Sequence, residues 1–306
     1  MLVGYSPEHT NQIYHNNFIN NTNQASVTVG YENVWDDGYP SGGNYWSDYT
    51  GLDLYSGPYQ NETGSDGIGD TPHIIDANNR DSYPLMYPYG TETFKLIITT
   101  TTGGTTNPQP GTYIHPAGAI VNVTAFPNTG YSFDYWLLDG NVRTENPITV
   151  IMDANHTLEA HFIDVAQPII DKPHQWPPPN EVEPDMAVLV YVNVTDRESG
   201  VNKTILSYTI DNGLTWNNIT MELVCYLPCD KWFYIAEIPG MPANTLVKYK
   251  IIAYDNAGNY AIEDNAGQYY VYTVIPEYPS TGLRINHADN LIHNSPFEDK
   301  KKAPTS

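Results

Sequence analysis

Basic residues are scarce in this sequence. Its 306 residues include 13 Lys plus Arg against 35 Asp plus Glu, which gives a formal net charge of −22 and a pI of about 4.4. A surface this negative repels phosphate backbones and anionic membranes over a Debye length, roughly 10 Å at 0.1 M salt. The composition therefore excludes nucleic acid as a partner. Only 16% of the residues are charged, so Asn, Thr, Ser and Tyr carry the polarity, as is typical of extracellular surfaces.

Long apolar runs are also missing. No segment approaches the roughly 18 to 20 apolar residues that a membrane-spanning helix needs, so we expect no membrane span in this chain. Residues 1–10, MLVGYSPEHT, do not contain the apolar core of a signal peptide. We expect that the signal and the anchor of an exported protein are absent from this chain, as in a fragment or a processed product.

The sequence contains only two cysteines, Cys225 and Cys229, in the segment CYLPC. Two thiols without a neighbouring histidine cluster are too few for a zinc site. A short disulfide between them and a pair of free thiols are both open. The other extracellular features favour the disulfide.

Recognisable catalytic motifs are absent as well. The sequence has no Gly-x-Ser-x-Gly, no phosphate-binding loop and no histidine pair at metal-binding spacing on one face. Paired carboxylates occur only in glycine-rich turns, where Asp66 and Asp70 could flank a glycosidic bond if a groove were present. We therefore predict that the protein is not an enzyme.

Tyrosine, in contrast, is abundant. The 25 tyrosines outnumber the 7 Phe and 6 Trp together. Strands with one solvent-exposed face favour tyrosine, because its aromatic ring packs on the sheet while its hydroxyl group reaches solvent. The abundance of tyrosine therefore indicates an all-β chain. The length is sufficient for two or three domains, each with its own core.

Residues 35–86 have the most specific composition. Glycine, proline, Asp and Asn recur throughout this stretch, which excludes a helix and predicts a series of turns held by packed aromatic rings. Within it, Asp66 and Asp70 stand four apart across glycines, and Asp53 lies upstream. These three residues are candidate ligands of a structural calcium ion, because calcium prefers hard oxygen ligands. Hydrogen bonding of the same carboxylates to turn amides is the alternative interpretation.

Short motifs across residues 13–86 carry a family resemblance. They are IYHNNFINN at 13–21, WDDG at 35–38, GNYWSDY at 43–49, DGIGDTP at 66–72 and YPLM at 83–86. Together they resemble the C-terminal end of right-handed parallel β-helix proteins of archaeal surfaces, related to the NosD family of periplasmic copper-site accessory proteins and to sugar-binding or sugar-hydrolysing β-helices. The resemblance implies one final coil followed by a cap. Copper is not supported, because the nine histidines are scattered.

Residues 91–163 change character. Ile148, Val150 and Met152 alternate with polar residues, and the pattern resumes at Leu158 after an Asp-Ala-Asn turn, which predicts a half-buried hairpin. With GYSF at 130–133, NPITV at 146–150 and AHF at 160–162, the segment resembles the B-repeat of internalins, a spacer module. We interpret Trp136 as its core plug rather than a sugar platform. His156 and His161 point to opposite faces of one strand, which argues against a shared metal.

The C-terminal half begins with a Pro-rich segment at 164–184, predicted to be a linker. Alternating valines from 188 and a hairpin around Asp211-Asn212-Gly213 then predict a β-sandwich over 185–275. YTIDNG at 208–213 and AYDNAGN at 253–259 resemble immunoglobulin-like or fibronectin type III-like domains. Asp255, with its neighbouring asparagines, is read as a hydrogen-bonded turn, with a cation as the alternative. Residues 276–306 are polar and predicted to be disordered.

Seven Asn-x-Thr sequons are candidate N-glycosylation sites. Their spread over all segments is compatible with an exported glycoprotein. They are Asn20, Asn61, Asn122, Asn155, Asn193, Asn202 and Asn218.

The predicted fold class is all-β and multidomain: the end of a parallel β-helix with a glycine-rich cap (1–90), a small β-repeat module (91–163), a linker (164–184), an immunoglobulin-like β-sandwich (185–275) and a tail. The predicted function is a non-enzymatic extracellular or cell-surface protein, acting as an adhesion or cell-envelope structural element. The alternative is carbohydrate binding through exposed Tyr and Trp, as an appendage of a glycan-degrading β-helix. Cell-envelope components or surface glycans are the expected partners, and self-association is left open.

Overall fold

The computed structural model describes residues 10–28, 30–226, 231–276 and 300–302. Every regular element in these ranges is a strand, which confirms the all-β prediction. No helix in the described ranges has the length and apolar character needed to cross a bilayer. The chain divides into two units, Met1–Ile163 and Asp164–Ser306.

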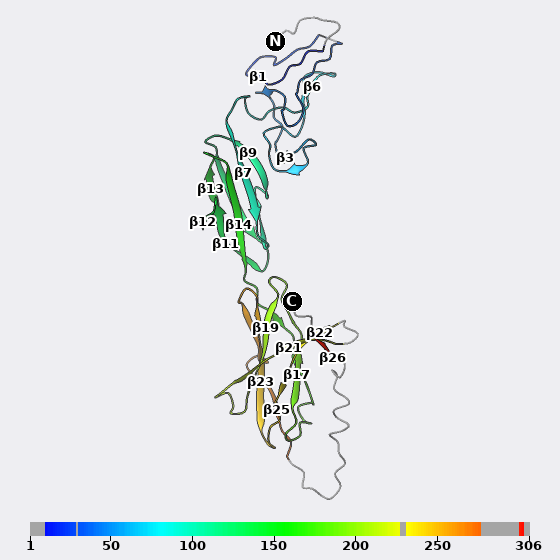
Figure 1. Ribbon diagram of the computed structural model, residues 1–306, viewed down its shortest axis with the longest axis vertical. Coiled ribbons are helices and arrows are strands. Elements are labelled where there is room, and N and C mark those ends of the chain that lie inside the picture. Colours follow the sequence, from blue (N-terminus) through cyan, green and yellow to red (C-terminus); the bar gives the residue numbers. More distant parts are fainter. Residues whose placement is uncertain (1–9, 29, 227–230, 277–299, 303–306) are drawn as a thin grey trace. The chain divides into compact units, whose positions relative to one another are not determined.

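Residues 10–90, here called the cap, consist mostly of loops and turns (Figure 1). β1 (Asn17–Phe18) pairs in parallel with β2 (Tyr45–Trp46), and Tyr45 forms a further parallel bridge with Leu85. Successive passes of the chain therefore run in the same direction, as they do in one coil of a β-helix. Two short antiparallel pairs complete the cap: β3 (Tyr55–Ser56) with β4 (Glu62–Thr63), and β5 (His73–Ile74) with β6 (Arg80–Asp81).

Aromatic rings form the core of the cap, as the sequence predicted. Trp35 and Trp46 are 2% and 1% exposed. The Trp46 ring stacks on Phe18 at 4.2 Å and on His73 at 4.4 Å between ring centroids. Because six short strands provide few ladder bonds, this packing carries much of the cap's stability.

Residues 91–163, here called the repeat module, form two sheets around one core. The first sheet has the order β13-β10-β8 and the second β12-β11-β14-β7-β9. Their bounds are β7 (Thr93–Thr100), β8 (Gly104–Asn107), β9 (Gly111–Pro116), β10 (Ile120–Pro127), β11 (Tyr131–Leu138), β12 (Asn141–Arg143), β13 (Ile148–Ile151) and β14 (His156–Asp164). Trp136 is completely buried in this core, which confirms its interpretation as a plug.

The hairpin predicted from β13 and β14 is wrong, although the inward positions are right. Ile148, Val150 and Leu158 are all buried. However, β13 pairs with β10, whereas β14 pairs in parallel with β7 in the other sheet. The turn after Met152 therefore crosses the core from one sheet to the other. Two strands that face one core from opposite sheets show the same alternation of apolar and polar residues as two strands that pair with each other.

A close contact joins the cap to the repeat module within the first unit. β9 is the edge strand of its sheet. The Ile114 amide donates a 2.8 Å hydrogen bond to Oγ of Ser65. An added Cβ at Gly64 would collide with the Thr112 backbone, so only glycine allows this approach. The cap thus covers an edge that would otherwise be open to pairing with another chain.

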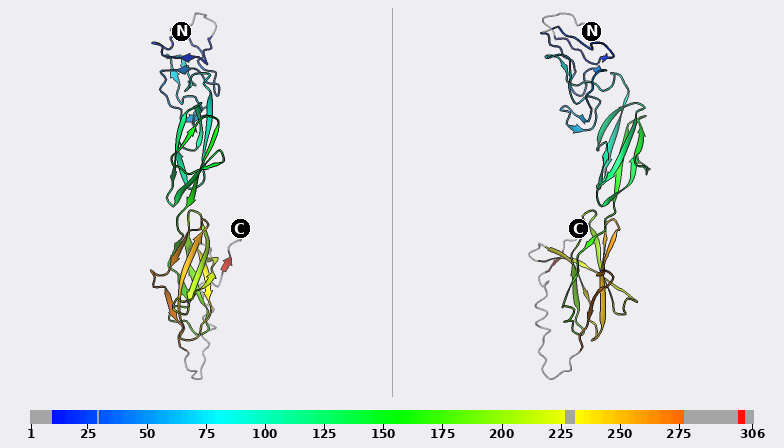
Figure 2. Two further views of the ribbon diagram at one scale, coloured as in Figure 1. Left: turned by 90° about the vertical axis from the view of Figure 1, so that its left-hand side faces the viewer. Right: turned by 180° about the vertical axis from the view of Figure 1, so that it is seen from behind.

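The second unit is a β-sandwich, and Figure 2 (right) shows its two layers. One sheet has the order β16-β17-β22-β21-β26, and the other contains β20-β19-β23-β24 with β25 also paired to β23. The bounds are β16 (His174–Trp176), β17 (Val188–Val192), β19 (Val201–Thr209), β20 (Asn217–Thr220), β21 (Glu222–Tyr226), β22 (Lys231–Ile238), β23 (Leu246–Asp255), β24 (Tyr260–Glu263) and β25 (Tyr270–Thr273).

The core of the sandwich lies between these sheets. Val188, Val190 and Val192 of β17 meet Val247 and Ile251 of β23, and all five are completely buried. β19 pairs with β20 across the Asp-Asn-Gly turn, so the predicted hairpin is confirmed.

The prediction of a linker over 164–184 is wrong. β15 (Ile169–Ile170) pairs with β18 (Val194–Thr195), and β16 pairs with β17, so this segment belongs to the sandwich. Pro173 and Pro177 flank β16 rather than interrupt it. β16 is an edge strand, where proline is tolerated because one side of the strand needs no ladder donor.

Two further predictions fall largely outside the described residues. Cys225 is buried in β21, but Cys229 lies in the undescribed range 227–230, so the disulfide stays a prediction. Most of the tail predicted to be disordered, 276–306, is likewise not described. Within it, β26 (Lys300–Lys302) pairs antiparallel with β21, so these three residues form a strand.

Candidate functional site

The three predicted calcium ligands lie in interlocked turns of the cap. The Asp53 carboxylate accepts hydrogen bonds from the amides of Asp66 and Gly67, at 3.1 and 2.9 Å. In return, Asp70 accepts bonds of 3.0 and 3.1 Å from the amides of the two residues that follow Asp53. Each segment therefore supplies the carboxylate that satisfies the other segment's amides. This is the turn-capping interpretation of these acids.

Asp66 is engaged in the same way. Its carboxylate accepts bonds from the amides of Gly57 and Ile68 and from the side chain of Gln60, at 3.1 to 3.2 Å. Burial raises the pKa of Asp53 to about 7, with further contributions from the negative charges of Asp66 and Asp70. A calcium ion bound by this set stays a prediction.

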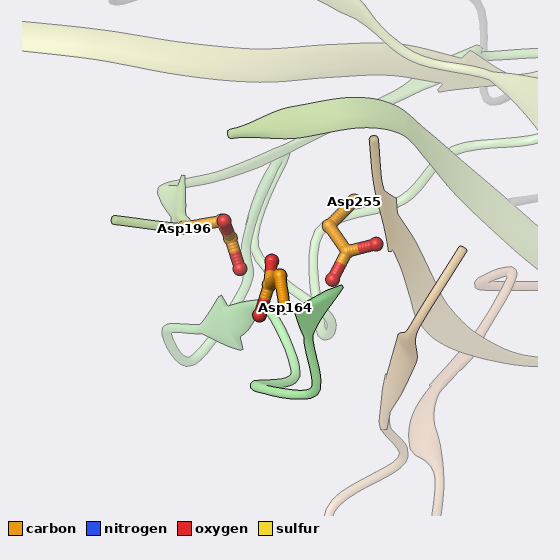
Figure 3. Close-up of side chains that lie close together, drawn as sticks. All are labelled: Asp164, Asp196 and Asp255. Atoms are coloured by element: carbon orange, nitrogen blue, oxygen red, sulfur yellow. The ribbon is translucent and has the colours of Figure 1, made fainter. Parts of the chain in front are cut away.

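A different acidic cluster occurs in the second unit. Within the described ranges, the one group of three His, Cys, Asp or Glu side chains with ligand atoms within 4.8 Å of one another is Asp164, Asp196 and Asp255. Their carboxylates point toward one another (Figure 3). Asp164 is the last residue of β14, Asp196 directly follows β18, and Asp255 is the last residue of β23. Three strand ends thus bring the acids together.

Hydrogen bonds fix these side chains. Asp255 accepts bonds from both the backbone and the side-chain amide of Asn259, at 2.7 and 2.8 Å. Asp196 accepts bonds from the amides of Ser199 and Gly200 through one oxygen. Asp164 and Asp255 are 6% and 0% exposed, so two of the three carboxylates are buried.

Only one member of this cluster, Asp255, is recognisable from the sequence as a candidate cation ligand. Asp255 was considered with the following asparagines as a turn or a cation site. Asp164 lies at the start of the segment predicted to be a linker, and the sequence motifs do not single out Asp196. The available signal was that each acid directly follows a strand, but the spacings of 32 and 59 residues do not show which strand ends meet.

The two histidines considered for metal binding form separate contacts. His156 lies 2.6 Å from Asp139 and 3.1 Å from Asp153. His161 contacts Glu159 at 2.8 Å and stacks on Tyr135. The hydrogen bond that Asp139 accepts from its ring raises the pKa of His156 above its usual value.

Most of the predicted glycosylation sites are accessible. Six of the seven sequon asparagines are exposed: Asn20, Asn61, Asn122, Asn155, Asn202 and Asn218. Asn193 is half-buried, and its side chain donates a 3.1 Å hydrogen bond to Asp171. Accessibility is compatible with glycosylation at the six exposed positions, and modification itself stays a prediction.

Trp46 cannot act as an exposed sugar platform. Its ring is enclosed in the cap core, and its indole N–H donates a hydrogen bond to the buried Asp81 carboxylate. Exposed rings do occur nearby: Tyr55 and Tyr59 are 44% and 84% exposed. Only such rings can stack on a ligand from solvent.

Tyr55 borders a pocket of about 610 Å³ within the first unit. The pocket lies where the cap meets the repeat module, and its lining is mainly apolar and aromatic. Lining side chains include Leu52, Leu54, Tyr55, Met86, Tyr87 and His115. Nε2 of His115 is itself buried and has no hydrogen-bond partner.

The chain is thus a multidomain all-β protein with one loop-rich cap and two strand-built modules. A family model described as Divergent InlB B-repeat domain matches residues 94–166, and one described as Periplasmic copper-binding protein (NosD) matches residues 3–51. Both matches support resemblances predicted from the motifs, and neither extends over half of the chain. No curated protein matches the chain.

Copper ligation is not apparent in the described part of the second match. His15 stacks on Tyr89 at 4.2 Å and lies 3.1 Å from the Ser41 carbonyl oxygen. Among the described residues between 10 and 51, no three His, Cys, Asp or Glu side chains converge.

Proposed function

We propose that this chain is a non-enzymatic, secreted or surface-displayed protein whose β modules act as a structural or adhesion element of the cell envelope. The two family matches support an extracellular or envelope location, because one family is described as periplasmic and the other is named for internalin repeats. The strongly negative charge and the exposed sequons suit the same location. The immunoglobulin-like assignment of the sandwich rests on its sequence resemblance and its two-sheet architecture.

The junction between cap and repeat module is the observation that carries this proposal. Ser65 Oγ accepts the Ile114 amide bond at 2.8 Å, and glycine at positions 64 and 111 allows direct backbone packing. A junction fixed by backbone contacts moves little, because any hinge motion would leave the edge of β9 unsatisfied. Such a junction suits a rigid spacer.

The carboxylates of the cap also argue for a structural role. Both oxygens of Asp53 and both oxygens of Asp70 accept backbone hydrogen bonds. A glycosidase needs one carboxyl that donates a proton and another that attacks or activates water. Carboxylates held by turn amides are poorly placed for either step.

Two assays test the proposal together. The full chain is incubated with a panel of soluble and insoluble polysaccharides, and release of reducing ends is measured. It is also sedimented with isolated cell envelopes. We expect co-sedimentation and no release. Release that is abolished by Asp70→Asn in a folded variant would overturn the non-enzymatic proposal, and failure to associate with any envelope fraction would overturn the envelope role.

Carbohydrate binding is the second candidate, favoured by the pocket beside Tyr55. Its aromatic lining and its half-exposed tyrosine are typical of sugar-stacking sites. A glycan array probed with the full chain tests this candidate. A genuine hit should be lost in Tyr55→Ala and kept in Tyr59→Ala, because Tyr59 is more exposed but is outside the pocket. Equal loss in both variants would argue against the pocket.

A further inference from the structure

We propose that Asp164, Asp196 and Asp255 bind a calcium ion that fastens one end of the sandwich. This site is separate from the calcium predicted in the cap, and it does not depend on the proposed function. Each of the three side chains offers one oxygen within 4.8 Å of the others. Figure 3 shows the carboxylates converging from three different strand ends.

Unused buried oxygens are the first reason. Asp164 uses Oδ1 to accept the Ala166 amide bond at 2.8 Å, whereas its Oδ2 is buried without a hydrogen-bond partner. Asp196 shows the same division, with Oδ1 bonded to two amides and Oδ2 buried without a partner. Buried carboxylate oxygens are normally paired, because desolvation without a partner is costly. Two such oxygens in one cluster indicate a missing ligand.

Charge is the second reason. Among the described residues, no Lys or Arg forms an ion pair with any of these three carboxylates. Three carboxylates in a largely buried cluster repel one another, and the described part of the chain places no cationic side chain in contact with them. A divalent cation would provide it.

The donor set selects the cation. All three side chains are carboxylates, and such hard oxygen donors suit calcium or magnesium rather than zinc or copper. The buried hydroxyl of Ser199, which also has no hydrogen-bond partner, lies in the turn that Asp196 organises. An irregular set drawn from three strand ends favours calcium, because magnesium demands near-ideal octahedral geometry.

The consequence is local fastening of the second unit. Asn256 already links two of the contributing turns through its side-chain bonds to the carbonyl oxygens of Ser199 and Gly200, at 2.8 and 3.1 Å. Asn259 links Asp255 to the backbone carbonyl of Asp164. Calcium would add a charged connection among the same three segments, including the residue at which the unit begins.

Calorimetric titration of the EDTA-treated full chain with calcium chloride tests the proposal. We expect saturable binding with a Kd of about 0.1 to 1 mM, the range of extracellular calcium modules, and a higher thermal transition for the second unit. Asp164→Asn should weaken binding at least about tenfold, since it removes one charged ligand. Asp171→Asn is the matched control, because Asp171 is an exposed aspartate near the start of the same unit and should leave binding unchanged.

Several outcomes would overturn the assignment. They are the absence of saturable binding in the wild type, unchanged binding in folded Asp164→Asn and Asp196→Asn variants, or loss of binding in Asp70→Asn alone, which would place the ion in the cap. Equal affinity for magnesium would overturn the choice of calcium. Asp196 is only half-buried, so Asp196→Asn provides a second variant if circular dichroism shows that Asp164→Asn is unfolded.

Discussion

Oδ2 of Asp81 accepts a 2.9 Å hydrogen bond from Nε1 of Trp46, and both side chains are buried. The same oxygen accepts a 2.7 Å bond from the Asn44 amide. Burial raises the pKa of Asp81 to about 6, although these hydrogen bonds act in the opposite direction. A buried acid therefore orients the central ring of the cap.

Asp81→Ala is expected to destabilise the first unit by about 2 to 4 kcal/mol, because it leaves the indole and amide donors buried without an acceptor. Urea unfolding of the full chain, followed by tryptophan fluorescence, measures the loss. Asp48→Ala is the control, since Asp48 is an exposed aspartate two residues after Trp46 in the chain. Equal losses in the two variants would show that the buried hydrogen bonds contribute little.

The raised pKa of Asp53 predicts a pH dependence of cap stability. Its folded pKa of about 7 lies above the ordinary value of 3.8, so the folded state holds the proton more tightly than the unfolded state. Stability should therefore fall as the pH rises from about 4 to about 7. Asp81 contributes in the same direction. Calorimetry between pH 4.5 and 8 should show a lower transition at higher pH, and Asp53→Asn should flatten the dependence. An unchanged slope in that variant would contradict the prediction.

The raised pKa of His156 predicts how the stability of the repeat module depends on pH. Its pKa is raised chiefly by the hydrogen bond that the ring donates to Asp139. The stabilising effect of His156 is therefore complete below the ordinary pKa of 6.5 and is lost as the pH rises through the higher folded value. The effect should stay below about 1 kcal/mol, because Asp139 is partly exposed. Unfolding from pH 6 to 9 should show this loss in the wild type but not in His156→Gln. Additive effects of His156→Gln and Asp139→Asn would show that the pair is not coupled.

Gly111→Ala is expected to loosen the junction between cap and repeat module. An added Cβ would lie 2.6 Å from the Thr63 carbonyl oxygen, and this backbone contact cannot move without shifting the cap. Hydrogen exchange at the Ile114 amide should become faster. In Gly118→Ala nothing lies within 4 Å of the added Cβ, and the strain comes only from a φ of +79° in the turn after β9, so that amide should lose less protection than in Gly111→Ala. Protection that survives in both variants would show that the junction tolerates displacement.

Asp70 distinguishes the two interpretations of the acidic turns in the cap. Both of its oxygens accept backbone bonds, so we expect Asp70→Ala to lower the stability of the first unit by about 1 to 3 kcal/mol whether calcium is present or not. Urea unfolding in EDTA and in calcium chloride makes the comparison. A loss that appears only with calcium would instead support a structural ion at Asp53, Asp66 and Asp70.

The two strands after Asn146 show how far sequence patterns reach. Alternation placed Ile148, Val150 and Leu158 inside, and all three are buried. It also suggested that the two strands pair, which is wrong, because they face the same core from different sheets. Alternation shows which face of a strand is buried. The same faces are buried whether the two strands pair in a hairpin or lie in opposite sheets.

The Pro-rich segment shows a second limit of local patterns. Prolines at 173 and 177 indicate an irregular chain, but β16 between them pairs with β17 at the edge of a sheet. Whether a short segment gains a partner depends on the strand that arrives beside it. Composition alone contains no information on that neighbour.

The sequence by itself determined the all-β class, the order of the modules and most inward-facing positions, because these follow from residue chemistry repeated over a few neighbouring positions. Only the tertiary structure decided that Trp46 is enclosed, that the cap carboxylates satisfy turn amides, and that Asp164, Asp196 and Asp255 meet. Each of these outcomes depends on which distant segments come together. That choice is made by packing of the whole unit, since no local pattern encodes the identity of a remote partner.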